Sequence, residues 1–192
     1  MLQFKRSILV FAGLSVICGL IYPLGITAVS QVLFSHQSNA SVIKKGDVIV
    51  GSELIGQHFI SPEHFHGRPS AIDPPYDASN SSGSNLAPSS AKLLQQVKAR
   101  VEQVRKENSL PSNIPIPADL VLASASGLDP NISAEAALLQ VPRIARERKI
   151  PESVVEKIIH QNTENPFLWI WGMPHVNVLR LNIALESIAV QR

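Results

Sequence analysis

Three histidines close together in the sequence have side chains that could bind a metal ion. His64 and His66 are two residues apart, which would place both rings on one face of a strand, and His58 precedes them. A metal site needs further ligands, and no carboxylate lies at a matching spacing. The pattern therefore favours ordinary surface or hydrogen-bonding histidines over a metal site.

Two serines before a glycine form a second candidate site, in which a serine would act as a nucleophile. Ser124 and Ser126 precede Gly127, and a serine nucleophile would need a histidine or lysine base nearby, which the sequence does not indicate. The alternative is that Ser124, Ser126 and Asp129 accept hydrogen bonds from backbone N–H groups in a turn. We favour the turn.

Other polar residues invite a functional and a structural interpretation. Arg68 precedes Pro69, so its side chain could clamp a carboxylate of a partner protein or tie a loop to its own domain. The second interpretation is favoured. Asn177 and Asn182 lie in an apolar context and are expected to make structural hydrogen bonds.

The composition excludes several classes of protein. The chain of 192 residues has a net charge of +2 without a basic stripe, so nucleic acid is not an expected partner. Its one cysteine, Cys18, allows neither an internal disulfide nor a cysteine-based metal site. It has no phosphate-binding glycine loop, no His-Glu-x-x-His and no Gly-x-Ser-x-Gly.

An uncharged apolar run predicts one transmembrane helix over residues 8–34. A cleaved signal peptide is the alternative, but its apolar core is shorter. Lys5 and Arg6 precede the run, which favours a cytoplasmic N-terminus (residues 1–7) and a domain outside the cytoplasm. Pro23, near Gly25, predicts a kink near Ile21.

After a linker (residues 35–47), residues 48–192 are expected to form one soluble α+β domain. Strands are predicted at 48–50 and 176–181, with 55–60 as a partner strand or an adjoining turn, and a long packed loop at 61–90. Helices are predicted after Ser90 and Ser133, and from Pro151. Pro142 should kink the second helix or restart it.

Several stretches resemble the C subunit of the Kdp-type potassium-transporting P-type ATPase. They are GSELIGQ at 51–57, FHGRPSA at 65–71, Tyr76-Asp77, GSNL at 83–86, SASGLDPNIS at 124–133 and VNVL at 176–179, followed by Asn182. These stretches occur in the family's order over nearly the whole chain. Ala125 departs from the family, which usually has glycine between the two serines.

The resemblance implies an accessory subunit without enzymatic activity of its own, in a complex that hydrolyses ATP to import potassium. Its partners would be a channel-like potassium-translocating subunit, a catalytic ATPase subunit, a very small fourth membrane peptide and the lipid bilayer. The chain lacks the Asp-Lys-Thr-Gly-Thr phosphorylation motif. The family's C chain is regarded as needed for assembly and as a catalytic chaperone that raises the ATP affinity of the pump subunit.

Gln140 matches the glutamine that the family links to nucleotide, although no tightly bound cofactor is expected and ATP would enter through the complex. Since ATP is cytoplasmic and the flanking charges place Gln140 outside, we expect an indirect effect on ATP affinity. The residues expected at subunit interfaces are Arg68, Ser70, Asn85, Ser124, Ser126, Asp129, Arg143 and Asn177. A membrane-anchored hydrolase acting on cell-wall or peptide substrates, and a free-standing binding module, remain the alternatives.

Overall fold

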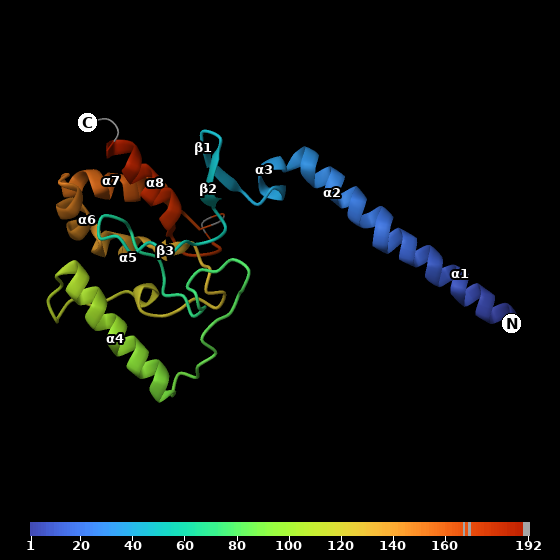
Figure 1. Ribbon diagram of the computed structural model, residues 1–192, viewed down its shortest axis with the longest axis horizontal. Coiled ribbons are helices and arrows are strands. Elements are labelled where there is room, and N and C mark those ends of the chain that lie inside the picture. The colour runs from blue at the N-terminus through green and yellow to red at the C-terminus, as the bar shows by residue number, and fades with distance from the viewer. Residues whose placement is uncertain (167, 169, 190–192) are drawn as a thin grey trace. The chain divides into compact units, whose positions relative to one another are not determined.

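The computed structural model describes residues 1–166, 168 and 170–189. The chain divides into two compact units, Met1–Val50 and a second unit that begins at Gly51 (Figure 1).

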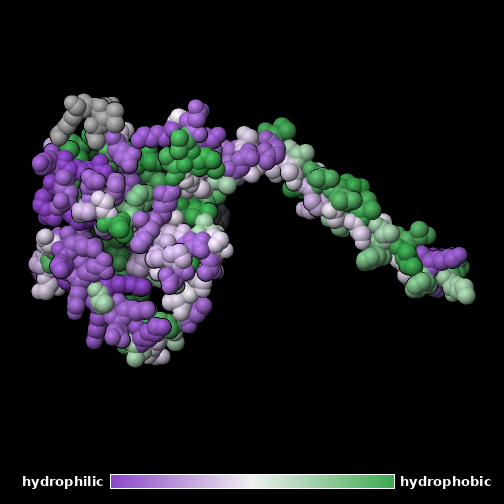
Figure 2. Space-filling view, viewed as in Figure 1, coloured by the Kyte–Doolittle hydropathy of each residue, from purple (hydrophilic) through white to green (hydrophobic). Residues whose placement is uncertain are grey.

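The first unit begins with one continuous helix, Leu2–Leu33. Within the described residues it is the one helix long and apolar enough to cross a membrane, and Figure 2 shows apolar side chains along its length. It consists of α1 (Leu2–Val16), a π-helical turn η1 (Ile17–Ile21) and α2 (Tyr22–Leu33). The π-helical turn lies directly before Tyr22-Pro23, where proline removes a backbone donor. The kink predicted near Ile21 stays a prediction.

Short elements follow this helix. They are α3 (Ser35–Ser38), β1 (Val42–Lys45) and β2 (Val48–Ser52), and the two strands pair with one another. Residues 35–47, interpreted as a linker, therefore contain a helical turn and a strand. Residues 55–60 contain no strand, so they form the adjoining turn rather than the partner of β2.

The second unit combines helices with a small sheet, as the predicted α+β class requires. The sheet has the order β3 (Asn131–Ser133), β5 (His175–Asn177), β4 (Thr163–Glu164), and both pairings are antiparallel. The helices are α4 (Ala91–Asn108), the 3-10 turn η2 (Ala118–Leu120), α5 (Ala134–Leu139), α6 (Val141–Arg148), α7 (Glu152–Asn162) and α8 (Val178–Ala189).

Helix boundaries follow the expected capping chemistry. The hydroxyl oxygens of Ser90 and Ser133 accept hydrogen bonds from the N–H groups of Leu93 (3.4 Å) and Ala136 (3.1 Å), so both predicted caps are confirmed. Pro142 lies in the first turn of α6, immediately after α5 ends, so it restarts the helix. The helix expected from Pro151 begins one residue later.

The predicted strand over residues 176–181 is wrong beyond Asn177. The side-chain oxygen of Asn177 accepts a hydrogen bond from the N–H of Arg180 (3.1 Å), which caps α8 at this point. Val178, Leu181 and Leu185 then recur at helical spacing and are buried. The short alternating stretch matched a strand pattern, but the cap and the longer repeat favour a helix.

The core lies between the sheet, helices α5–α8 and the long loop. Its buried apolar side chains are Phe65, Leu120, Ile132, Ala136, Ala137, Val141, Ile144, Ala145, Val155, Ile158, Ile159, Val176, Val178, Leu181 and Leu185. Phe65 belongs to residues 53–90, which contain neither helix nor strand. The predicted long loop is therefore confirmed, and it is packed onto the domain through a fully buried phenylalanine.

Candidate functional site

The long loop is joined along its length to the turn at residues 124–129. Nη1 of Arg68 donates to the carboxylate of Asp129 at 3.0 Å, and its Nη2 is within 3.5 Å of the carbonyl oxygens of Leu122 and Ala123. The hydroxyl of Ser70 donates to the carbonyl of Gly127 at 2.8 Å. Arg68 thus ties the loop to its own domain, as the favoured interpretation predicted.

Gly127 is required by this close approach. Its φ is +70°, and a Cβ at this position would lie 2.6 Å from Ile72 and 2.8 Å from the carbonyl oxygen of Ser82. Any larger residue would therefore face both an unfavourable backbone conformation and a clash with the loop. The loop can therefore pack this closely against the turn only with glycine at position 127.

The two serines before Gly127 act as turn acceptors. Oγ of Ser124 accepts from the N–H of Gly127 (2.8 Å), and Oγ of Ser126 accepts from the N–H of Leu128 (3.1 Å). The carboxylate of Asp129 accepts from the N–H of Asn131 (3.0 Å). The hydrogen bonds of the two hydroxyls within the described residues include no histidine, lysine or carboxylate, so the turn interpretation is confirmed.

Two buried side-chain amides hold the backbone of consecutive loop residues. The amide of Asn182 accepts from the N–H of Phe65 (2.8 Å) and donates to its carbonyl (3.0 Å). The amide of Gln140 does the same for His66, at 2.8 and 3.2 Å. Each amide replaces the hydrogen-bonding partner that a neighbouring strand would supply.

Arg143 completes this buried polar cluster, which we define as Asn108, Gln140, Arg143 and Asn182. Its guanidinium donates to the side-chain oxygens of Asn108 (3.0 Å) and Gln140 (2.8 Å). It also donates to the backbone carbonyls of residues 62 and 64. Burial without a directly bonded carboxylate lowers the pKa of Arg143 to about 10, so the side chain remains charged at neutral pH.

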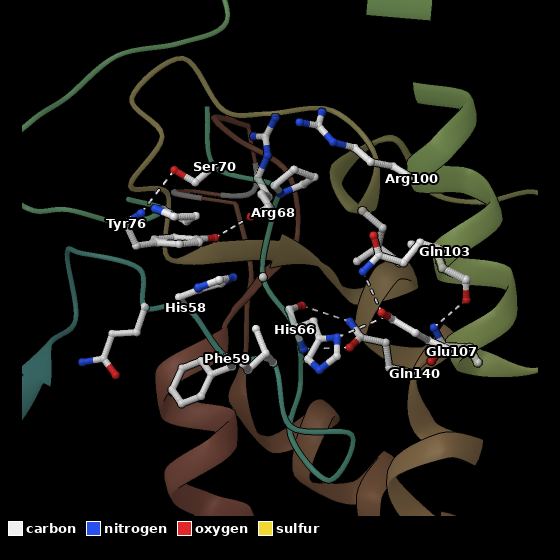
Figure 3. A pocket seen from close by; sticks show the side chains of 18 residues that line it. His58, Phe59, His66, Arg68, Ser70, Tyr76, Arg100, Gln103, Glu107 and Gln140 are labelled. Carbon is white, nitrogen blue, oxygen red and sulfur yellow. Dashed lines mark hydrogen bonds and ion pairs between the residues drawn. The ribbon is translucent and has the colours of Figure 1, made fainter. Parts of the chain in front are cut away.

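A cavity of about 310 Å³ lies between the loop and α4. Figure 3 shows that His58, His66, Arg68 and Tyr76 reach it from the loop, and Arg100, Gln103 and Glu107 from the helix. The ring of His58 stacks on Tyr76, and the His66 ring lies 3.5 Å from the carboxylate of Glu107. Nε of Arg68 is buried and has no hydrogen-bond partner among the described residues.

Burial is the main cause of the pKa shifts of the ionisable groups around the cavity. Burial, then the Arg143 charge, lowers the pKa of His66, while Glu107 opposes the change. Burial, then Asp129, raises the pKa of Tyr76 to about 12. Burial lowers the pKa of Arg100. At neutral pH both the His66 ring and the Tyr76 hydroxyl are therefore uncharged.

The structure separates the predicted site residues into groups. Arg68, Ser70, Ser124, Ser126 and Asp129 lie together at the contact between loop and turn, whereas Gln140 and Arg143 belong to the buried polar cluster. Asn177 lies elsewhere, where its amide donates to the carbonyl of Glu53 (2.8 Å). Asn85 is exposed in the loop, and Pro23 and Gly25 are in α2.

The three histidines do not form a metal centre: nowhere in the described residues do three histidine, cysteine or carboxylate side chains come together to hold an ion. Three residues around the site were not predicted from the sequence, namely Asn108, Arg100 and Tyr76. Tyr76 is within a stretch that resembles the Kdp family, and this was the one available signal. The other two resemble ordinary polar positions of a surface helix.

Comparison with known proteins gives one consistent match. Residues 4–187 match the family described as "K+-transporting ATPase, c chain" (KdpC). The potassium-transporting ATPase KdpC subunit of Rhodopseudomonas palustris (strain BisB5) is 46% identical over 197 residues, covering 96% of both chains. The subunit of the same description from Dechloromonas aromatica is 46% identical over 187 residues (96% of this chain and 97% of that one). That from Caldanaerobacter subterraneus is 45% identical over 183 residues (95% and 94%).

Proposed function

Because the chain belongs to the KdpC family of potassium-transporting ATPase subunits, we propose that it is a non-catalytic accessory subunit of an ATP-driven potassium uptake complex in a bacterial inner membrane. In this proposal it stabilises the assembly of a channel-like potassium-translocating subunit, a catalytic ATPase subunit and a small fourth membrane peptide. The observation that carries the proposal is the family match, which includes both the apolar helix and the domain.

Two observations support an accessory rather than a catalytic role. The sequence lacks the Asp-Lys-Thr-Gly-Thr motif that would form an aspartyl phosphate. The hydroxyls of Ser124 and Ser126 accept backbone hydrogen bonds in a turn, and none of their hydrogen bonds in the described part of the chain involves a base.

We further propose that the domain lies outside the cytoplasm and caps the outer face of the potassium-translocating subunit. Lys5 and Arg6 flank the start of the apolar helix, and cationic flanks remain on the cytoplasmic side. An outward domain can raise the ATP affinity of a catalytic subunit only by favouring one conformation of its partners. We infer that the chain acts as a catalytic chaperone in this indirect way.

The geometry of Gln140 supports the indirect route over direct nucleotide binding. Its oxygen accepts hydrogen bonds from the His66 N–H and from Arg143. Its nitrogen donates to the carbonyls of His66 and Ala136. An amide has two donors and two acceptor positions, so all four are occupied and the side chain is 1% exposed. A nucleotide would have to displace these bonds.

Purification of the tagged full chain in a mild detergent tests the assembly role. We expect two larger membrane proteins to co-purify, and potassium-stimulated ATPase activity to be lost when the chain is omitted and restored when it is added back. The Ser126→Ala variant should support the same activity. A chain that purifies alone, or one whose isolated form hydrolyses a substrate in a Ser126-dependent manner, would contradict the proposal and support a binding module or a hydrolase.

Protease treatment of sealed vesicles of known orientation tests the placement of the domain. We expect the domain to be digested from the extracytoplasmic side and protected from the cytoplasmic side. Digestion from the cytoplasmic side alone would show that the domain lies in the cytoplasm. Direct nucleotide contact would then become the leading explanation of the effect on ATP affinity.

A further inference from the structure

The connection between β4 and β5 has a strongly apolar sequence, and several of its described side chains are exposed. Residues 165–174, here called the apolar loop, read Asn-Pro-Phe-Leu-Trp-Ile-Trp-Gly-Met-Pro and carry no charge. Four of the described side chains of the loop are largely exposed: Leu168 (62%), Ile170 (73%), Trp171 (62%) and Met173 (77%). Four exposed apolar side chains within six residues of one connection indicate a surface that is covered in the functional state.

The two ends of the apolar loop are held by the sheet. β4 and β5 pair antiparallel with Thr163 opposite Val176, which is fully buried. Below the loop, Arg180 forms an ion pair with Glu164 (2.7 Å), and His175 lies 3.7 Å from the same carboxylate. Both ends of the apolar loop are thus fixed by the pairing of β4 with β5. The carboxylate of Glu164 at this position is paired with Arg180.

We propose that the apolar loop is a second membrane contact, which inserts into the headgroup region of the bilayer that the helix Leu2–Leu33 spans. Tryptophan with aliphatic neighbours is the composition that favours the membrane–water interface. Lysine and arginine are absent from the loop, so the lipid partner is recognised through apolar burial and not through anionic headgroups. Zwitterionic phosphatidylcholine is sufficient.

The covalent connection to the helix favours lipid as the occupant. The helix ends at Leu33 and the second unit begins at Gly51, and even a fully extended chain of residues 34–50 spans at most about 60 Å. The loop is therefore kept at a high effective concentration near the bilayer surface, which makes weak insertion effective.

The size of the loop is also better suited to lipid than to a protein. Four largely exposed side chains supply about 500 Å² of apolar surface, taking about 150–200 Å² for each. A stable protein interface needs about 800 Å² on each partner and a rim of polar groups. Insertion into the headgroup region requires neither.

The inference depends on the membrane anchor alone. It can therefore fail while the assignment to a potassium-transporting ATPase stands, and that assignment can fail while the inference stands.

The tryptophans provide a direct measurement. The chain has two, Trp169 and Trp171, and both belong to the apolar loop, so fluorescence excited at 295 nm reports this segment alone. The full chain is reconstituted without partners into phosphatidylcholine vesicles, with or without lipids brominated near the headgroup end of the acyl chains. We expect blue-shifted emission and at least twofold quenching by the brominated lipids, unchanged by 0.5 M salt.

Two matched variants locate the effect. Ile170 and Ile60 are 73% and 74% exposed, and Ile60 lies outside the apolar loop. Ile170→Asp should lower the quenching at least twofold, whereas Ile60→Asp should leave it unchanged, with circular dichroism confirming that both variants are folded. Emission typical of water-exposed tryptophan without quenching would overturn the proposal. Protection that develops only when the other ATPase subunits are added would overturn it in favour of a protein contact.

Discussion

Gln140, at the junction between α5 and α6, and Asn182, in α8, perform the same task. Each presents one donor and one acceptor to the backbone of a loop residue, a pairing that a carboxylate could not make because it has no donor at neutral pH. Arg143 then fills the remaining acceptor position on Gln140 and binds two further loop carbonyls. Residues 62–66 are therefore positioned by side chains and not by a sheet.

Equivalent substitutions at these two amides separate an indirect from a direct role in ATP affinity. Gln140→Ala and Asn182→Ala each leave one N–H and one carbonyl of the loop without a partner, at a cost of about 2–4 kcal/mol. If the loop transmits the effect, both variants should raise the KM for ATP of the assembled pump at least threefold.

The matched control is Gln103→Ala, because Gln103 is exposed on α4 and its amide bonds to Glu107. This variant should leave both the KM for ATP and the thermal midpoint of the chain nearly unchanged. A rise in KM with Gln140→Ala but not with Asn182→Ala would indicate direct nucleotide contact. Unchanged KM in both variants would remove the proposed link to ATP.

Helix α8 illustrates how a single residue sets an element boundary. Asn177 ends β5, caps α8 through its oxygen and donates from its nitrogen to the carbonyl of Glu53. Arg180, in the first turn of α8, forms ion pairs with Glu53 and Glu164, both at 2.7 Å. The start of α8 is thus joined to the beginning of the long loop.

Substitutions at Asn177 should separate the contributions of its two hydrogen bonds, the cap of α8 and the bond to Glu53, to the free energy of unfolding. Asn177→Ser retains an oxygen that can cap α8 but cannot reach Glu53, so we expect a loss of about 1–2 kcal/mol. Asn177→Ala also removes the cap, which adds about 1 kcal/mol. Thermal unfolding of the detergent-solubilised chain, followed by circular dichroism, measures both, and Ser187→Ala on exposed α8 surface is the control. Equal losses for the serine and alanine variants would show that the cap contributes nothing.

At the scale of the whole molecule, two half-buried histidines, His64 and His66, couple the stability of the domain to pH. Burial, followed by the Arg148 charge, lowers the pKa of His64, and burial with Arg143 lowers that of His66. The carboxylates of Glu63, Glu186 and Glu107 face these rings and only partly oppose the shifts. The folded chain consequently binds fewer protons at these rings than the unfolded chain does.

Acid should therefore destabilise the domain in the range where the unfolded histidines titrate. We expect a thermal midpoint that is insensitive to these groups above about pH 6.5 and falls as the pH decreases below that value. The double variant His64→Gln, His66→Gln should flatten the change between pH 7 and pH 5. A wild-type chain with the same thermal midpoint at pH 5 and pH 7 would contradict this expectation.

Local sequence patterns were sufficient for the features that depend on neighbouring residues. The uncharged run specified a helix that is long and apolar enough for a membrane, because the helix satisfies its own backbone and needs no tertiary partner. The caps at Ser90 and Ser133 and the restart at Pro142 were also predicted, since each acts within one helical turn. The ordered motifs identified the family.

Tertiary structure alone decided what the polar residues of those motifs do. Gln140 and the loop residue it holds are 74 positions apart in the sequence, and Asn182 and Phe65 are 117 apart. Hydrogen bonds between such distant residues leave no periodic signal. The sequence therefore predicted structural hydrogen bonds for Asn182 but not their partners, and it did not show that Gln140 is a buried clamp. The same limit applies to Asn177, whose role as a cap depends on where β5 ends against its neighbouring strands.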